Sequence, residues 1–431
     1  MQGVQIMAKG VSPDHVVIVG AGFVGLSTAW YLQEQGVKVT VVDRGGVASG
    51  ASWGNAGWLT PALTLPIAEP SVFTNGLKMM FDPASPLYIP LKADAKLIRF
   101  LLGFAWHSTP KNWEKAMRTF SEIGTTGLDA FDEISESTQA GPGVSEKTLP
   151  ANPFLTGFRS LADRDGLLHE FEMIHKTGGN VEFDLLTGDE LREIEPTLSG
   201  EVAAGIAIKN QRFLNPPKYM DSLAESVIAR GGDIIGAFNV TDVRDNGGSV
   251  TVIGSEGRAI TADHAVMATG AWMNDLTKKF GVNIVVQAGR GYSFTVEPEH
   301  MPTHPIYFPA QRVACTPLGD RFRIAGTMEF RDANHKLEPK RIEAIVAAAK
   351  PVYAGINWEN RKEEWVGGRP CTADGLPLIG QTNSARISVG GGHGMWGVAL
   401  GPLTGKILAS QITGQSVPGV ARHFNPLRKG F

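Results

Sequence analysis

The sequence is poor in cysteine. Its 431 residues contain only two, Cys315 and Cys371. They lie far apart and form no CxxC pair, so the sequence indicates neither a disulfide framework nor a thiolate zinc site. The ten histidines include no HExxH motif, and we therefore expect no bound metal. Such a composition fits the reducing cytoplasm.

The sequence also has no large excess of charge of one sign and no long apolar run. The chain carries 40 basic and 43 acidic residues, a net charge of -3, which offers no basic surface for nucleic acid. No apolar run reaches the length of about 18 residues that a transmembrane helix needs. Residues 1–14 lack the cationic start and apolar core of a signal peptide, so we expect a flexible leader there.

Glycine, in contrast, is frequent, with 52 residues. Glycine is the residue that lets a backbone approach a ligand closely. Hydrophobic residues make up 42% and charged residues 19% of the chain, as in ordinary folded proteins. The length predicts two or three domains.

The clearest motif lies near the N-terminus. Residues 16–19 form an apolar run typical of a buried strand, and the pattern GxGxxG follows at once with Gly20, Gly22 and Gly25. A helix is predicted over 26–35. The first glycine permits a tight turn, the second lets the backbone approach a pyrophosphate, and the third allows close helix–strand packing. The unit predicts a Rossmann-type dinucleotide site, with phosphate at the helix N-terminus near Phe23 and Val24.

Asp43 ends the second strand of this unit, which is predicted over 37–42. A carboxylate there accepts hydrogen bonds from a ribose 2′-hydroxyl and argues against the 2′-phosphate of NADP. The alternative is that Asp43 only begins a turn. We expect Arg44 to contact the same ligand. Later in the chain, the small residues at 268–271 follow a buried strand, so Thr269 and Gly270 form either a second approach to the dinucleotide or only a tight turn.

The rest of the chain alternates between helical and strand patterns. Residues 45–70 are predicted as loop, 71–135 as mostly helical, and 136–152 as a surface excursion. Further helices are predicted over 217–230, 341–349 and 398–412. Strands are predicted over 240–243, 250–253, 265–268 and 387–389, and strands of a second sheet over 292–296 and 322–326.

Four blocks of the chain resemble the D-amino acid oxidase superfamily of flavoproteins, closest to bacterial D-amino acid dehydrogenases and to glycine or glyphosate oxidase-like enzymes. The resemblance covers nearly all of the chain after residue 14. The blocks are the unit 20–43, the segment ASWGNAG at 51–57, the segment RGYS at 290–293, and the C-terminal group GGRP at 367–370, DGLPLIG at 374–380 and GHG at 392–394.

This resemblance implies an α/β fold in two parts. A Rossmann-type FAD-binding domain would be built from 15–70, 180–275 and 361–431. A substrate domain would be built from 71–179 and 276–360, on a mainly antiparallel sheet with helices. The further FAD contacts that it implies are Ser52, Asn55, Ala56, Gly57, Trp58, Val240, Gly392, His393, Gly394 and Met395.

The resemblance also implies that FAD is bound without a covalent link. Related sarcosine oxidases attach the flavin to a cysteine seven residues before the position of Asp374, and here that position is Gly367. Cys371 is near but not at the matching site. For His393, a hydrogen bond to flavin and a purely structural role in the turn stay open, with the second favoured. The dipole of the final helix would stabilise negative charge on the reduced flavin.

Arg369, in the GGRP block, is the residue that the resemblance assigns to the carboxylate of a small amino acid, and a guanidinium fork suits that group. A structural salt bridge is its alternative role. Tyr292 is a second candidate for the substrate wall, although a tyrosine packed in a strand core is an equal alternative. Glycine oxidases carry an arginine where this chain has Met395, which weakens a strict glycine oxidase assignment.

The implied reaction is oxidative deamination. A hydride passes from the substrate α-carbon to flavin N5, and the imine then hydrolyses to a 2-oxo acid. D-amino acids are the expected substrates, with glycine, N-substituted glycines and D-hydroxyproline-type imino acids as alternatives. Electrons would pass to oxygen or to a membrane quinone.

The sequence also contains patterns of two other functions. Residues 50–54 match GxSxG, the nucleophile elbow of serine hydrolases, but a loop precedes Ser52 where that elbow needs a strand. The apolar stretches 77–81 and 97–106 carry basic neighbours, so a peripheral membrane contact through 71–106 is a further hypothesis, with a core helix as its alternative. We therefore expect a cytoplasmic protein that could lie at the inner face of the membrane, and a homodimer stays open.

Overall fold

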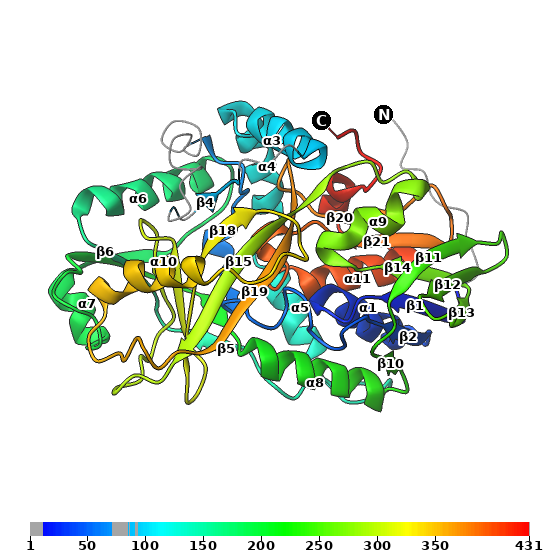
Figure 1. Cartoon of the computed structure of the whole chain (residues 1–431), viewed down its shortest axis with the longest axis horizontal. Helices are drawn as coiled ribbons and strands as arrows, with labels where there is room; N and C mark the ends of the chain where they lie inside the picture. Colours follow the sequence, from blue (N-terminus) through cyan, green and yellow to red (C-terminus); the bar gives the residue numbers. More distant parts are fainter. Residues whose placement is uncertain (1–11, 71–84, 86, 91–93, 431) are drawn as a thin grey trace.

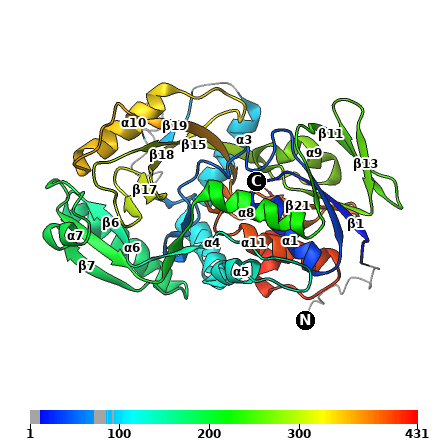
Figure 2. The ribbon, with the colours of Figure 1, turned by 90° about the horizontal axis from the view of Figure 1, so that it is seen from below.

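A computed structural model describes residues 12–70, 85, 87–90 and 94–430 of the chain. Most of the expected leader and the apolar segment 77–81 lie outside the described residues. Two large sheets organise the rest. Figures 1 and 2 show their elements at opposite ends of the long axis, with a group of helices between them.

The first sheet has six strands in the order β10-β2-β1-β14-β21-β20. All neighbours are parallel except β20 and β21, which are antiparallel. This is the predicted Rossmann-type sheet. Its strands are β1 (His15–Val19), β2 (Lys38–Val42), β10 (Asp233–Ile235), β14 (His264–Met267), β20 (Leu378–Gln381) and β21 (Ile387–Gly391).

Alternating residues of β1 divide the core around this sheet. Val16 and Ile18 pack toward the helices, and Val17 and Val19 pack toward the opposite layer. The helices on the first side are α1 (Phe23–Glu34), α5 (Thr126–Ile134), α8 (Pro216–Ala229) and α11 (Gly401–Ile412). The opposite layer holds α9 (Met273–Thr277) and a small sheet of β11 (Val240–Asp245), β12 (Val250–Gly254) and β13 (Ala259–Ala262).

Helix α1 begins at Phe23, three residues earlier than predicted. It is buried at ten of its twelve positions, so it has no division into an apolar and a polar side. The reason is tertiary, because α1 packs against α11 and α8 as well as against the sheet. A helix enclosed on several sides no longer shows a single apolar stripe.

The second sheet has nine strands, eight of them in the order β19-β15-β18-β17-β16-β6-β8-β7, and β4 pairs with β18. Most of its pairs are antiparallel, as predicted for the second domain, and only β16–β6 and β18–β4 are parallel. Its strands are β4 (Leu87–Tyr88), β6 (Phe154–Phe158), β7 (Phe183–Thr187), β8 (Ala204–Ile208), β15 (Val286–Val296), β16 (Ile306–Phe308), β17 (Val313–Pro317), β18 (Phe322–Phe330) and β19 (Lys362–Thr372).

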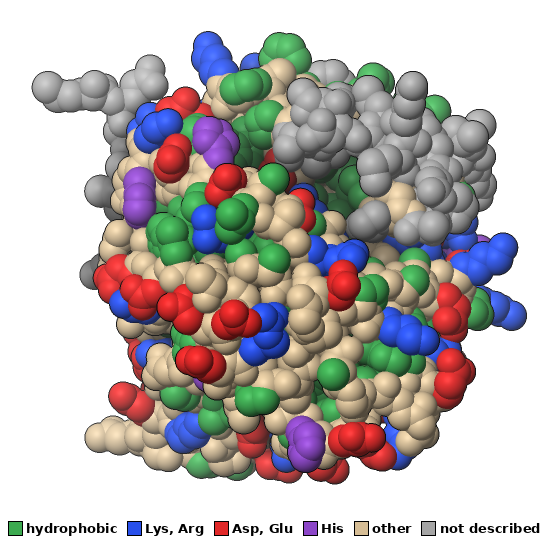
Figure 3. All heavy atoms as spheres, turned by 90° about the vertical axis from the view of Figure 1, so that its left-hand side faces the viewer, with side chains coloured by type: hydrophobic (Ala, Val, Ile, Leu, Met, Phe, Trp, Pro, Cys, Tyr) green, Lys and Arg blue, Asp and Glu red, His purple; other side chains and the backbone are tan. Residues whose placement is uncertain are grey.

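Helices cover both faces of this sheet. Helix α10 (Pro339–Ala349) lies on one face and α6 (Leu161–Lys176) on the other, while α7 (Gly188–Ile194) lies near the outer edge. Figure 3 shows the end of the molecule that these elements form, where acidic and basic side chains are interspersed.

The sheets do not follow the predicted domain boundaries everywhere. Strands β7, β8 and β19 come from segments expected in the FAD-binding domain, yet they pair within the large sheet. Helix α5 comes from a segment expected in the substrate domain, yet it packs on α1 and α11. These placements depend on contacts distant in sequence. The residue-level division of the chain into domains stays a prediction.

The remaining elements connect the two sheets. A small sheet joins β3 (Trp58–Leu59), β9 (Gln211–Phe213) and β5 (Leu149–Ala151). The apolar stretch 97–106 lies in α3 (Ala95–His107). The rest of the segment predicted as mostly helical forms α4 (Pro110–Ile123) and α5, and Gly124 ends α4. None of the helices that the structure describes combines the length and the apolar character needed to span a bilayer.

Candidate cofactor and substrate site

A cavity of about 350 Å³ opens at the carboxyl ends of β1, β2, β14 and β21. Open parallel sheets bind ligands at this edge. Most of the predicted site residues line it: Gly20, Gly22, Phe23, Val24, Asp43, Arg44, Ser52, Asn55, Val240, Thr269, Gly270, Arg369, His393, Gly394 and Met395. Gly25, Ala56, Gly57, Trp58, Gly392 and Tyr292 do not line it.

The three glycines of the N-terminal motif have different roles. A Cβ on Gly20 would lie 2.3 Å from the carbonyl oxygen of Ala268, and a Cβ on Gly25 would lie 1.8 Å from that of Gly20. Because neither glycine has a side chain, the turn after β1 can lie close to residue 268 on one side and to α1 on the other. Gly22 instead faces the cavity, where a Cβ would meet only Ser52 Oγ, at 3.0 Å. The N-terminus of α1 therefore approaches the cavity with no side chain at position 22, as a pyrophosphate requires.

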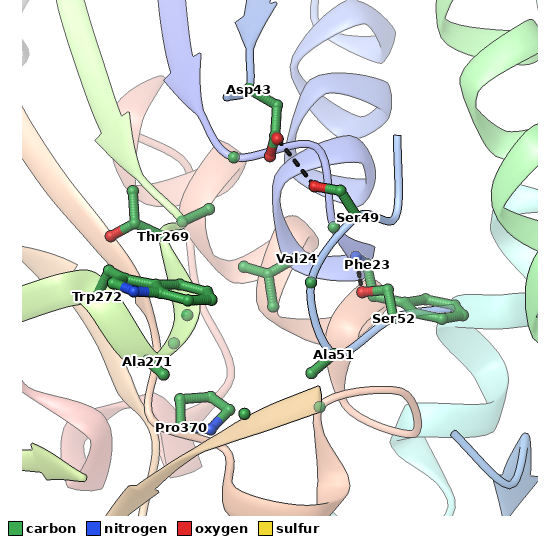
Figure 4. Close-up of a pocket in the computed structure, with 18 of the residues that line it drawn as sticks. Phe23, Val24, Asp43, Ser49, Ala51, Ser52, Thr269, Ala271, Trp272 and Pro370 are labelled. Carbon is green, nitrogen blue, oxygen red and sulfur yellow. Dashed lines mark hydrogen bonds between the residues drawn. The ribbon is translucent and has the colours of Figure 1, made fainter. Parts of the chain in front are cut away.

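Asp43 both begins a turn and lines the cavity. Its Oδ2 accepts from the Ala21 N–H at 3.0 Å, and its Oδ1 accepts from the N–H groups of Gly45 and Gly46 at 2.7 and 3.0 Å. The Ser49 hydroxyl also donates to Oδ1, at 3.0 Å (Figure 4). The carboxylate therefore begins a turn, and its hydrogen bond to a ribose stays a prediction. It fixes the loop that follows β2 and stays at the cavity edge.

Ala51 and Ser52, at the start of the segment 51–57, lie across the cavity from Trp272 (Figure 4). Ser52 Oγ accepts from the Phe23 N–H at 3.1 Å, which fixes the loop to the start of α1. No strand precedes Ser52, because residues 45–51 form turns, so the nucleophile-elbow geometry of a hydrolase is missing.

The same segment is anchored to the large sheet. Arg323, on β18, donates to the carbonyls of Trp53 and Asn55, and the Ser293 hydroxyl donates to that of Gly54 at 2.6 Å. Thr316 accepts from Trp58 Nε1 and donates to the carbonyl of Ala56.

These bonds explain why three predicted contacts lie outside the cavity. Ala56, Gly57 and Trp58 connect the loop to the sheet and to residue 214, where a Cβ on Gly57 would lie 2.2 Å from the carbonyl oxygen of Leu214. Their role in the structure is to hold the loop against its neighbours.

His393 shapes the turn before α11. Its Nε2 lies 2.8 Å from Thr404 Oγ1 inside that helix, and burial lowers its pKa to about 4. The ring is therefore neutral at ordinary pH. Its backbone neighbours Gly391 and Gly394 line the cavity, while Gly392 lies behind them against Thr372. The structural role that the sequence favoured for His393 matches this geometry.

Thr269 and Gly270 bring a second stretch of backbone to the cavity, after β14. The Thr269 hydroxyl is buried and has no hydrogen-bond partner in the described part of the chain. Protein atoms cover this hydroxyl, so the part of Thr269 and Gly270 that can meet a ligand is their backbone. This backbone, the start of α1 and the Asp43 carboxylate line one cavity, and together they fit the binding of a dinucleotide.

Arg369 is the cationic side chain that β19 contributes to this cavity. Its guanidinium lies against Gly291, and Nη1 donates to the carbonyl of Thr327 at 3.4 Å. Burial lowers its pKa, and within the described ranges no carboxylate forms an ion pair with it. The alternative role as a salt-bridge residue therefore has no partner there. Arg369 is half-buried and lines the cavity, and a guanidinium without a counter-ion there is suited to bind a ligand carboxylate.

Tyr292 lies on the opposite face of β15 from Gly291. Its ring belongs to the core under α10, and its hydroxyl donates to Glu329 Oε1 at 2.6 Å. The same oxygen accepts from Arg290 at 2.5 Å. The expectation of a substrate wall at Tyr292 is not supported, because side chains alternate along a strand and Arg369 occupies the other face.

Several cavity residues escaped the sequence reasoning. They are Ser49, Gly50, Ala51, Phe238, Asn239, Thr241, Trp272, Asp275, Trp365, Gly368, Pro370 and Val398, among others. Most are neighbours of predicted residues. Trp365 is the exception, because its ring fills the space beside Gly54 and Gly367, where a Cβ on Gly367 would come within 2.2 Å of it. In the sequence, the only sign of a bulky ring at this place is the pair of glycines, Gly54 and Gly367.

Within the described residues, no three histidine, cysteine or acidic side chains gather as a metal ligand set. Both cysteines are buried, and burial raises the pKa of each thiol to about 12. They are therefore poor nucleophiles.

Comparison with known proteins agrees with this geometry. The chain matches the family model DAO, FAD dependent oxidoreductase, over residues 15–411. It is 28% identical over 427 residues to a D-amino acid dehydrogenase of Cereibacter sphaeroides, with 96% of each chain covered. Among solved structures, glycine oxidase from Geobacillus kaustophilus matches with a TM-score of 0.71 at 20% identity, over 97% of this chain and 99% of that chain. Iminodiacetate oxidase from Chelativorans matches with a TM-score of 0.67 at 19% identity, over 95% and 98%.

Proposed function

The chain belongs to the DAO family of FAD-dependent oxidoreductases, and we propose that it oxidises the C–N bond of small D-amino acids to give 2-oxo acids. The observation that carries this proposal is the half-buried Arg369 side chain, which shares one cavity with the glycine motif and has no carboxylate partner in the described chain. The similarity to a D-amino acid dehydrogenase supports the substrate class.

The residues present fit FAD. Gly22 puts no side chain between the start of α1 and the cavity, Asp43 presents a carboxylate at the end of β2, and Thr269 and Gly270 bring a second stretch of backbone to the same cavity. When bound, FAD supplies the acceptor for the hydride of the substrate. The protein's part is to hold and orient both reactants.

Arg369 would bind the substrate carboxylate and so fix the α-carbon within the cavity. Its planar fork holds a carboxylate through two parallel N–H bonds, which sets orientation as well as affinity. The substrate amine must be neutral for the reaction, and no residue is assigned as its base. His393 is neutral and bonded to Thr404, which leaves it in a structural role.

The choice among related substrates rests on Met395. It lines the cavity with 41% of its side chain exposed, at the position where glycine oxidases carry an arginine. A thioether gives no second cation for a carboxylate, so D-amino acids with apolar side chains fit this wall better than glycine. Glycine, N-substituted glycines and D-hydroxyproline-type imino acids remain the alternative substrates.

The test is anaerobic reduction of the bound flavin by a panel of D- and L-amino acids, glycine, sarcosine and imino acids, followed by its visible absorption. We expect D-amino acids to bleach it fastest and NADH to leave it unchanged. Arg369→Lys should raise the KM for every reactive substrate while FAD stays bound, since a point charge does not replace the fork. An unchanged KM across the panel would reject the role of Arg369.

A second proposal concerns a membrane contact and the electron acceptor. Along α3, Ile98, Leu102 and Trp106 are 50%, 55% and 58% exposed and are spaced one helical turn apart. Such a stripe suits the headgroup region of a bilayer, where a quinone would be reached. Liposome flotation tests this, with an Ile98→Gln and Leu102→Gln double variant as comparison. Equal flotation of both proteins, or of neither, rejects it.

Oxygen consumption measured beside dye reduction separates oxidase from dehydrogenase, and light scattering decides the oligomeric state.

A further inference from the structure

Arg44 lies at the cavity, directly after Asp43, without a carboxylate partner among the described residues. Its guanidinium is held instead over the ring of Trp272, 3.7 Å from the ring centroid. A stacked arginine keeps its charge, and its N–H donors at the edge of the guanidinium stay free for other partners. The stack therefore presents a cation to the cavity.

Trp272 is fixed in turn from a different part of the chain. Its Nε1 donates to Asn334 Oδ1 at 3.0 Å. Asn334 belongs to the loop that follows β18, and its own N–H donates to Asp332 Oδ1 at 2.8 Å. The indole lines the cavity on one side and is bonded to this loop on the other.

The loop itself, residues 331–338, is held firmly by the large sheet. Buried Arg290 donates through Nη2 to the carbonyls of His335 and Lys336, at 2.7 and 2.9 Å. Gln287 donates to the carbonyl of Arg331 at 3.1 Å. A Cβ built on the cavity residue Gly368 would lie 3.6 Å from the Cβ of Ala333, so the loop also packs against the cavity wall.

From these contacts we propose that Trp272 and Asn334 are positioning residues that hold Arg44 as a cation for the pyrophosphate of FAD. The bond from Trp272 to Asn334 fixes the ring, and the ring fixes the guanidinium. FAD retention then depends on an exposed loop residue that does not itself line the cavity. The inference needs only the FAD dependence of the family and is independent of the substrate.

The experiment measures FAD affinity by the recovery of flavin fluorescence on release from the holoenzyme. Asn334→Ala and Trp272→Phe each remove the same hydrogen bond, so each should weaken binding about fivefold. Because the two changes share one bond, the double variant should be no weaker than either single variant. Asn283→Ala is the matched control, since this exposed asparagine bonds only to its neighbour Gly281 and lies away from the cavity.

Salt dependence gives a readout that a purely structural role would not move. Arg44→Met should weaken FAD binding about tenfold and flatten the dependence of affinity on salt, because a screened charge pair is lost. Asn334→Ala should reduce that dependence in part. Affinities of Asn334→Ala and Trp272→Phe within twofold of the parent, or an unchanged salt dependence in Arg44→Met, would overturn the proposal. If Trp272→Phe does not fold, Asn334→Ala and Arg44→Met alone decide.

Discussion

The guanidinium of Arg369 lies so close to Gly291 that a Cβ on this glycine would come within 2.1 Å of its atoms. The two residues belong to neighbouring antiparallel strands, with Arg369 paired to Gly289 in the register of β19 and β15. The missing side chain at position 291 thus creates the space that the guanidinium occupies. In the block RGYS the residue that matters for the cavity is the glycine, not the tyrosine beside it.

Gly291→Ala should therefore displace the Arg369 guanidinium. We expect the KM for amino acid substrates to rise about tenfold or more, because the loss of a bidentate contact to a charged group is worth about 1.5–3 kcal/mol. FAD affinity should change little, since Gly291 does not line the cavity. Steady-state kinetics and flavin titration measure the two effects separately.

Gly248→Ala serves as the control for this change, because a Cβ there meets no atom within 4 Å. Its kinetics should match those of the parent protein. A normal KM for Gly291→Ala would mean that Arg369 does not need its present position.

Gly22 and Gly25 should respond differently to alanine. At Gly25 the new Cβ would lie 1.8 Å from the carbonyl oxygen of Gly20, so we expect loss of folded protein. At Gly22 it would lie 3.0 Å from Ser52 Oγ and project toward the cavity, so the chain should fold with FAD affinity reduced about tenfold or more. Soluble yield, thermal unfolding and flavin content distinguish the two outcomes. Equal behaviour of both variants would contradict their assigned roles.

Asp43→Asn should weaken FAD binding and lower the melting temperature together. The carboxylate accepts from three backbone N–H groups and the Ser49 hydroxyl, and an amide NH₂ opposite these donors would repel them. Asp94→Asn is a useful comparison, because Asp94 caps α3 away from the cavity and accepts from two backbone N–H groups. That variant should lose a little stability and keep its FAD affinity. Equal flavin affinity in both variants would remove Asp43 from the cofactor site.

The flavin should leave the protein on acid denaturation. Position 367, where related sarcosine oxidases carry the linking cysteine, is a glycine covered by the Trp365 ring, and the nearest thiol on the strand, Cys371, is buried with its pKa raised to about 12. After precipitation in acid, we expect yellow supernatant and a colourless pellet. Flavin retained in the pellet would show a covalent link.

His264 should make the protein less stable in acid. It is buried on β14 beside Ser388, and desolvation lowers its pKa to about 4 in the folded state, against about 6.5 when exposed. Above about pH 6.5 neither state binds the proton, so the residue has no effect there. As the pH falls toward 4, only the unfolded chain takes up the proton, and stability is lost across that window.

Between about pH 7 and pH 5 the loss from His264 should reach roughly 2 kcal/mol. His264→Asn should flatten this part of the stability profile, measured by thermal unfolding at each pH. His169→Asn, at an exposed position on α6, is the control and should leave the profile as it is. Identical profiles for His264→Asn and the parent would refute the prediction.

The local patterns of the chain were sufficient to predict the nucleotide unit. Strand β1, the glycines and strand β2 are adjacent in sequence, and their chemistry depends on little else. The features that could not be predicted from the sequence depend on the pairing of strands that lie far apart in the chain. Which face of β15 carries Tyr292 follows from its register with β18 and β19. The same is true of β7 and β8, which join the large sheet from a segment expected elsewhere.

Trp365 and Asn334 show the same limit at single residues. Neither belongs to a recognisable motif, and each acquires its place through neighbours more than 60 residues away in sequence, Gly54 and Trp272. Sequence reasoning found the residues whose own type signals chemistry, such as Arg369 and Asp43. It missed those whose position alone gives them a role.

The alternation along β15 has a consequence for protein engineering. Gly289 and Gly291 face the side where Cys371 and Arg369 fill all the space, and Arg290 and Tyr292 face a closed core under α10. Neither face of the strand leaves room for a new side chain. A library intended to change substrate range should leave β15 unchanged and vary Met395, whose exposed side chain forms an adjustable wall of the same cavity.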